Sequence, residues 1–234
     1  MHLVVSPTEI TTSVTDTVLA IECVVVLVCL WRTPTGDRWR IGVWCWVFGL
    51  LALVSVLGSV AHGLEIPHSL RVALWKPLYL SLGLLVALFL VGAFFDWRGR
   101  IVAGRLVPCS LGAGAVFFGL TEFLDGGFVI FLVYEAVAMA GALAIYSFLA
   151  VTHRLRGAGI VAAAIVMNLA AAAVQASSLS VRICVSFDHN GVFHLIQMLA
   201  IAVLGLGLYL GLKPGAQRMI SESSVAANGS QPIS

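Results

Sequence analysis

Two short segments combine histidines with small and polar residues inside long apolar runs. Residues 58–62 end at His62, and residues 188–194 contain His189 and His194. Placing an ionisable side chain in hydrocarbon is costly, about 2.5–3.5 kcal/mol or more for a charged group at the centre of a membrane, so such groups normally have partners. Neutral imidazole is the commonest metal ligand among side chains. The three histidines are therefore candidate ligands of a metal ion within a membrane.

The composition indicates an integral membrane protein. Mean hydropathy is +1.04, and 60% of the residues are hydrophobic. Only 10% are charged, against about 25% in soluble domains. Because a spanning helix needs about 20 mostly apolar residues, the 234-residue chain has room for about seven spans and for no sizeable soluble domain. We expect an all-α, seven-transmembrane helix bundle.

The hydrophobic runs divide the chain into one membrane domain, residues 1–213, and a polar tail, residues 214–234, for which we expect a disordered cytoplasmic segment. Pro77 and Pro108 are expected near the starts of the third and fourth helices, since proline suits a first helical turn. The expected spans are residues 13–31, 41–63, 75–95, 106–124, 127–150, 158–178 and 191–212.

Basic residues predict the orientation of this bundle in a cell membrane. Ten of the 13 lysines and arginines fall in alternate connections and in the tail, and three fall on the other side: Arg71, Lys76 and Arg182. Cytoplasmic loops carry the excess of basic residues in most membrane proteins. We therefore expect the N-terminus outside and the C-terminus in the cytoplasm.

With seven spans, the two histidine segments lie at the same end of the bundle. The second helix ends near His62, and the seventh begins near His189. Ser55, Ser59 and His62 share a helical face, as do Asn190, His194 and Gln197, whereas His189 lies off that face unless the helix begins irregularly. Three acidic residues are expected at the same level, at the start of the first span and at the end of the fourth: Asp16, Glu122 and Asp125.

These segments resemble the seven-helix superfamily of alkaline ceramidases and of the adiponectin and progestin receptors. In that superfamily three histidines hold an intramembrane zinc ion, and a serine and an aspartate assist hydrolysis of a lipid amide. His62 and Ser59 match the second-helix residues, with two intervening residues where the superfamily has three, and His194 matches the second histidine of the seventh helix. At the first histidine's position stands Asn190, with His189 one residue away.

The third helix has no counterpart of the superfamily's aspartate, so another carboxylate would have to replace it. The candidates are Asp16, Glu65, Glu122, Asp125 and Asp188. The resemblance then implies a zinc ion held by His62, His189 and His194, with an open position for water. Zinc lowers the pKa of such a water to about 7. Ser59 would position this water or the developing oxyanion, and the carboxylate would shuttle a proton.

Three classes of function follow. The first is a zinc-dependent hydrolase of a lipid amide or ester, with a membrane lipid as substrate. The second is a lipid-sensing receptor without turnover, which the missing aspartate favours. The third is a carrier that uses Glu22 and Glu135, although a hydrogen bond from Glu135 to Asn168 or Gln175 is an equally direct explanation of that carboxyl. No nucleic-acid-binding signature is present.

Overall fold

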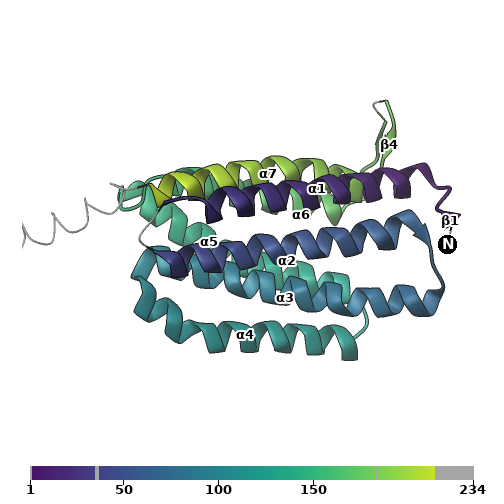
Figure 1. Ribbon diagram of the computed structural model, residues 1–234. Helices are drawn as coiled ribbons and strands as arrows, with labels where there is room; N and C mark the ends of the chain where they lie inside the picture. Colours follow the sequence, from purple (N-terminus) through teal and green to yellow (C-terminus); the bar gives the residue numbers. More distant parts are fainter. Residues whose placement is uncertain (1, 35–36, 183, 214–234) are drawn as a thin grey trace, which may run out of the picture.

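The computed structural model describes residues 2–34, 37–182 and 184–213, and within them it forms seven helices that pack side by side (Figure 1). All seven are long and apolar enough to cross a membrane, which confirms the predicted seven-helix membrane fold. The predicted tail, residues 214–234, lies outside the described residues. The helices are α1 Pro7–Trp31, α2 Arg38–Gly63, α3 His68–Arg98, α4 Arg100–Phe123, α5 Gly127–Val151, α6 Ala158–Gln175 and α7 His189–Leu212.

α3 and α4 begin several residues before the prolines that were expected near their starts. Pro77 lies inside α3, and Pro108 lies inside α4. The prediction that these prolines mark helix starts was therefore wrong, because a membrane bundle tolerates interior prolines when neighbouring groups satisfy the freed backbone. The actual boundary between α3 and α4 is Gly99, whose φ of 81° favours glycine.

In the described part of the chain, four two-residue strands lie near one end of the bundle, which we call the N-terminal end because the chain begins there (Figure 1). β1 His2–Leu3 pairs antiparallel with β2 Leu64–Glu65, which follows α2 directly. β3 Val181–Arg182 pairs with β4 Ser186–Phe187 in a hairpin that projects beyond the helices before α7 begins. Both pairs therefore connect helix ends at the level of the predicted histidine site.

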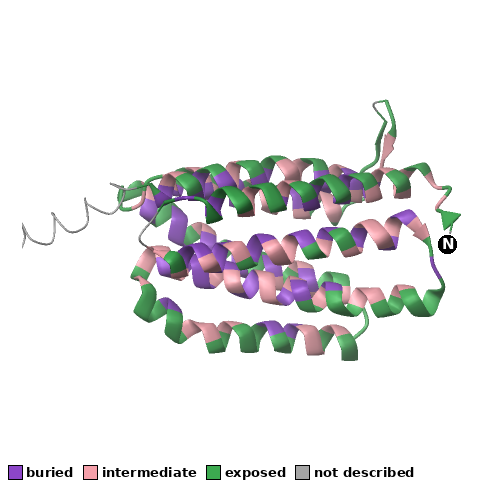
Figure 2. Cartoon of the chain, in the orientation of Figure 1, coloured by how far each residue is buried: buried purple, intermediate pink, exposed green. Residues whose placement is uncertain are grey.

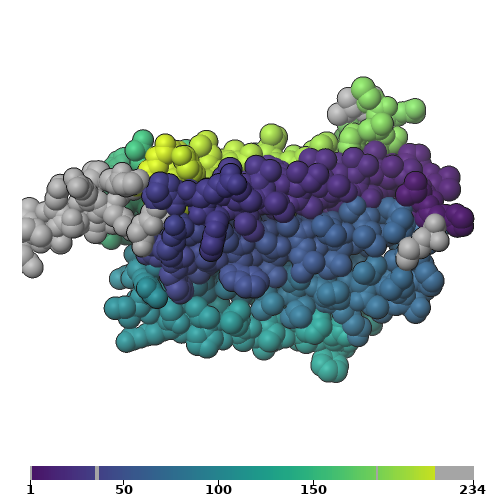
Figure 3. Space-filling view, viewed as in Figure 1, coloured from purple at the N-terminus to yellow at the C-terminus, as the bar shows by residue number. Residues whose placement is uncertain are grey.

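The helices pack in an order that sets α1 against both α2 and α7. α3 contacts α2, α4 and α5, while α6 lies between α5 and α7. α4 lies at the edge of the bundle, and only three of its residues are buried: Ala103, Gly114 and Phe117 (Figure 2). In the space-filling view, α1, α2, α3 and α4 form successive bands of one face, with α7 along the upper edge (Figure 3).

A buried ion pair joins the helices toward the opposite end. The guanidinium of Arg40 (α2) contacts the carboxylate of Asp96 (α3), with Nη2 and Oδ2 2.9 Å apart, and their side chains are only 4% and 1% exposed. Tyr146 (α5) donates a hydrogen bond of 2.8 Å to the same Oδ2, and Arg40 Nη1 donates to the carbonyl of Gly211 in α7. One polar cluster therefore fixes four helices.

Removing the carboxylate of this cluster tests its importance. We expect Asp96→Ala to lower the free energy of unfolding by about 3–5 kcal/mol, since Arg40 keeps a buried charge without a counter-ion. Glu122→Ala is the matched control. It breaks the more exposed ion pair with Lys76, in which the side chains are 28% and 53% exposed, and exposed pairs contribute about 1 kcal/mol or less. Thermal unfolding in detergent measures both, and equal losses would contradict the expectation.

Candidate functional site

A cavity of about 420 Å³ opens among the helices in the N-terminal half of the bundle. Its walls are mostly apolar, and residues of α1, α2, α3, α5, α6 and α7 line it. All three histidines predicted as metal ligands, His62, His189 and His194, reach this cavity, together with Asp16. The structure thus brings the two histidine segments to one site. His189 takes part because α7 begins at that residue, in the first turn of the helix.

Asp16 and His194 form the buried polar pair of this site. Their side chains lie with Asp16 Oδ1 3.4 Å from His194 Nε2, and the two residues are only 5% and 7% exposed. The other ring nitrogen, Nδ1, is 2.9 Å from the hydroxyl of Thr15. That hydroxyl can donate to the carbonyls of Thr11 and Thr12, and it then accepts from Nδ1–H. Nε2 is left facing the Asp16 carboxyl.

A glycine of α2 makes room for the Asp16 carboxyl. A Cβ atom on Gly58 would lie 2.7 Å from Asp16 Oδ2 and 3.1 Å from its Cγ. Small residues at helix interfaces in membranes permit this kind of close approach. Gly58 thereby lets α1 place a carboxyl between α2 and α7, beside His194.

His62 has a different carboxylate partner. Its Nδ1 lies 2.7 Å from Oε2 of Glu9, which stands in the first turn of α1. The two side chains are 21% and 38% exposed, so this contact lies at the rim of the bundle. α1 therefore supplies a carboxylate to each of the two histidines that come from different helices, Glu9 to His62 and Asp16 to His194.

Ser59 lies outside the cavity lining, although it was predicted beside the metal. Its hydroxyl is 2.8 Å from that of Thr17 and 3.2 Å from that of Ser13, both on α1. Ser13 also donates to the Ser59 carbonyl. The serine of α2 that lines the cavity is Ser55, which is buried. In this arrangement Ser59 joins α1 to α2.

The other predicted acids have partners or positions away from the cavity. Asp188 caps α7, since its Oδ1 accepts from the N–H of Gly191 at 2.9 Å and from the Thr12 hydroxyl at 3.3 Å. Glu122 pairs with Lys76 at 2.6 Å, and Asp125 is exposed in the turn between α4 and α5. Of the acids predicted as proton shuttles, Asp16 is the one that lines the cavity in the described chain.

The histidines do not form a ligand set as placed. Within residues 2–34, 37–182 and 184–213, no group of three histidine, cysteine or acidic side chains is arranged to hold a metal ion. His62 and His194 each direct Nδ1 to a partner on α1 rather than to a common point. The zinc site therefore stays a prediction.

Several polar contacts of the site were not predicted from the sequence. Glu9 and Thr15, which contact His62 and His194, belong to the first part of α1, which has six hydroxyl residues between positions 7 and 17. That density in a membrane span was the available signal, because hydroxyls in a bilayer bond either their own helix or a neighbour. Thr11 makes both kinds of contact, to the carbonyls of Thr8 and of Ser186.

Fold and cavity define a multi-pass membrane protein of seven helices whose polar site lies at one end. The chain belongs to DUF6962, a family of unknown function, whose model matches residues 11–213. The match runs from α1 through α7 and includes the cavity-lining Asp16, His62 and His194. No curated protein and no solved structure matches the chain.

The close approach at Gly58 generates a prediction. We expect Gly58→Ala to displace the Asp16 carboxyl and to lower the free energy of unfolding by about 1–3 kcal/mol, as overpacking does in well-packed interiors. Gly42→Ala is the control on the same helix, because its Cβ would meet nothing within 4 Å. It should be neutral or stabilising by up to about 1 kcal/mol. Thermal unfolding of both variants in detergent measures the difference, and equal stability would refute the close contact.

Proposed function

We propose that this protein binds an amphipathic, lipid-type molecule in the cavity at the N-terminal end of its bundle. One observation carries the proposal: three histidines and a buried aspartate from three helices line one mostly apolar cavity. Ligand pockets of about 300–1,000 Å³ with apolar walls and a few convergent polar groups are typical of small-molecule sites. A cavity of about 420 Å³ among membrane-spanning helices suits a ligand that is itself dissolved in the bilayer.

The arrangement of the walls suggests how such a ligand lies. Its polar group contacts His194 and Asp16, which are held rigidly by Thr15 and by the fit against Gly58. Its apolar part lies along the side chains of α2, α3 and α5 that line the cavity: Leu51, Leu78, Leu82, Leu85 and Phe131. Binding of this kind needs no turnover, as in a lipid-sensing receptor.

Replacing His194 tests the ligand site. We expect His194→Gln to weaken binding of a long-chain fatty acid about ten- to a hundredfold, since a hydrogen bond to a charged group contributes about 1.5–3 kcal/mol. His68→Gln is the matched control, because His68 is exposed at the start of α3 and does not line the cavity. Native mass spectrometry of the protein released from detergent counts bound lipid directly. Equal binding by both variants and the parent would overturn the proposed site.

We also propose that the N-terminal end of the bundle faces the outside of a cell membrane. The excess of basic residues in the connections at the opposite end supports this orientation. The cavity would then open toward the outer leaflet. Reporter fusions at the two termini measure the orientation, and a cytoplasmic N-terminus would reverse it.

A zinc-dependent hydrolase of a lipid amide or ester is the second candidate, in line with the resemblance to the alkaline ceramidase superfamily. It is favoured by the position of all three predicted ligands, His62, His189 and His194, on one cavity. Asp16 would be its proton shuttle. Among the described residues, the side chains do not form a ligand set in this structure.

Metal content separates the two candidates. For the hydrolase we expect a stoichiometric amount of zinc in the purified protein, reduced in His194→Gln and retained in His68→Gln, together with fatty-acid release from a fluorescent ceramide. Elemental analysis by mass spectrometry and chromatography of the labelled product make the two measurements. Protein that holds no zinc and releases no fatty acid after zinc is added would contradict the hydrolase and leave the binding function.

A further inference from the structure

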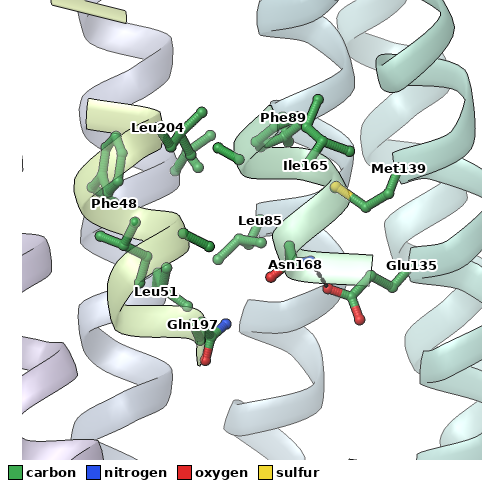
Figure 4. Close-up of a pocket in the computed structure, with 14 residues that line it drawn as sticks. Phe48, Leu51, Leu85, Phe89, Glu135, Met139, Ile165, Asn168, Gln197 and Leu204 are labelled. Carbon is green, nitrogen blue, oxygen red and sulfur yellow. Dashed lines mark hydrogen bonds between the residues drawn. The ribbon is translucent and has the colours of Figure 1, made fainter. Parts of the chain in front are cut away.

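A smaller chamber of about 60 Å³ lies next to the ligand cavity, deeper in the bundle. The two spaces share four lining residues: Leu51, Leu85, Glu135 and Gln197. Beyond them, apart from Asn168, the chamber is apolar, with Phe48, Phe89, Met139, Ile165 and Leu204 in its walls (Figure 4). The shared residues place the chamber directly beyond the inner end of the cavity.

Polar groups meet at the junction of the two spaces. Asn168 of α6 donates a hydrogen bond of 2.9 Å to Oε1 of Glu135, which is only 8% exposed. This contact confirms the predicted pairing of Glu135 with α6. Figure 4 shows Gln197 of α7 on the facing side of the chamber. The hydrogen bond from Asn168 reaches Oε1, and among the described residues Glu135 Oε2 and the Gln197 amide make no hydrogen bond; both residues line the cavity.

The junction lies far from the ends of the helices that build it. Glu135 and Gln197 each stand eight residues after the first residue of their helices, and Asn168 stands seven residues before the last residue of α6. At 1.5 Å per residue, these positions are about 10–12 Å from the helix ends that lie at the N-terminal end of the bundle. Polar groups at such a depth have no bulk water to bond, and leaving them unsatisfied costs free energy.

We propose that Glu135, Asn168 and Gln197 form a second polar subsite, which binds a hydroxyl group carried on the apolar chain of the ligand. The inference rests on the proposed ligand-binding function and specifies the class of ligand: an amphipathic lipid with a hydroxyl along its chain. The polar head occupies the Asp16–His194 pair, and the hydroxyl reaches the junction. The rest of the chain enters the apolar chamber.

A hydroxyl matches the groups left open at this junction. It can donate to Glu135 Oε2 and accept from the amide of Gln197, which satisfies both at once. A charged amine would lose its hydration in this mostly apolar chamber. Its attraction to one carboxyl offsets that desolvation cost only with good geometry. An unsubstituted chain would leave Glu135 Oε2 and the Gln197 amide without a hydrogen bond. The free-energy cost of leaving them unpaired favours the hydroxylated chain.

The experiment compares stearic acid with a positional series of monohydroxy stearic acids. Native mass spectrometry of the full-length protein measures the dissociation constant of each. We expect one or two neighbouring isomers, those whose hydroxyl reaches the junction, to bind roughly three- to tenfold more tightly than stearic acid, the gain of one to two net hydrogen bonds. Isomers with the hydroxyl nearer the head or the chain end should bind no better than stearic acid.

Two variants and a control assign the preference to the junction. Glu135→Leu and Gln197→Leu should each abolish the preference for the hydroxylated isomer while retaining binding of stearic acid. His68→Gln, at the exposed start of α3 and in the lining of neither space, should keep the preference. The comparison within the unaltered protein stands even if a variant fails to fold.

The outcomes also separate this inference from the function on which it rests. Binding of stearic acid without preference for any isomer would overturn the hydroxyl subsite and leave the ligand cavity supported. A preference that persists in both Glu135→Leu and Gln197→Leu would overturn the assignment to these residues. Absence of binding by every acid in the series would overturn the subsite together with fatty-acid binding in the cavity.

Discussion

The site depends on how α1 places a carboxyl inside a membrane bundle. Asp16 can lie beside His194 only because Gly58 carries no Cβ and because Thr15 holds the other side of the imidazole. A buried carboxyl and imidazole without such partners would each carry a large desolvation cost. The polar contacts of α1 with α2 and α7 therefore determine both the packing of the first helix and the chemistry that the cavity presents.

The opposite half of the bundle uses its buried charges differently. Arg40 and Asp96 satisfy each other, with Tyr146 and the Gly211 carbonyl completing the cluster among four helices. Such a closed network presents nothing to a ligand, whereas the histidine end keeps Asp16 and His194 at the wall of a cavity.

Sequence reasoning predicted the elements and the end of the bundle that carries the site, because hydropathy and alternating helix direction determine both. It did not predict the roles of side chains that depend on contacts with neighbouring helices. Ser59 shares a helical face with His62 by spacing, yet it bonds α1 while Ser55 lines the cavity. Similarly, Asp16 was one of several acids at one level, and only the packing of α1 against Gly58 distinguishes it from Asp188, which caps a helix instead.

The polar residues of α7 follow a line into the bundle. Asn190, His194 and Gln197 recur at helical spacing, and all three line the cavity, the last at its junction with the deeper chamber. Each polar side chain on the inward face of a membrane helix needs a partner in the apolar interior. Helix packing alone therefore does not account for three such side chains on α7. His194 has its partners on α1, while Gln197 faces an open space beside Glu135. The row thus leads from the Asp16–His194 pair to the junction beside Glu135, where the Gln197 amide makes no hydrogen bond within the described chain.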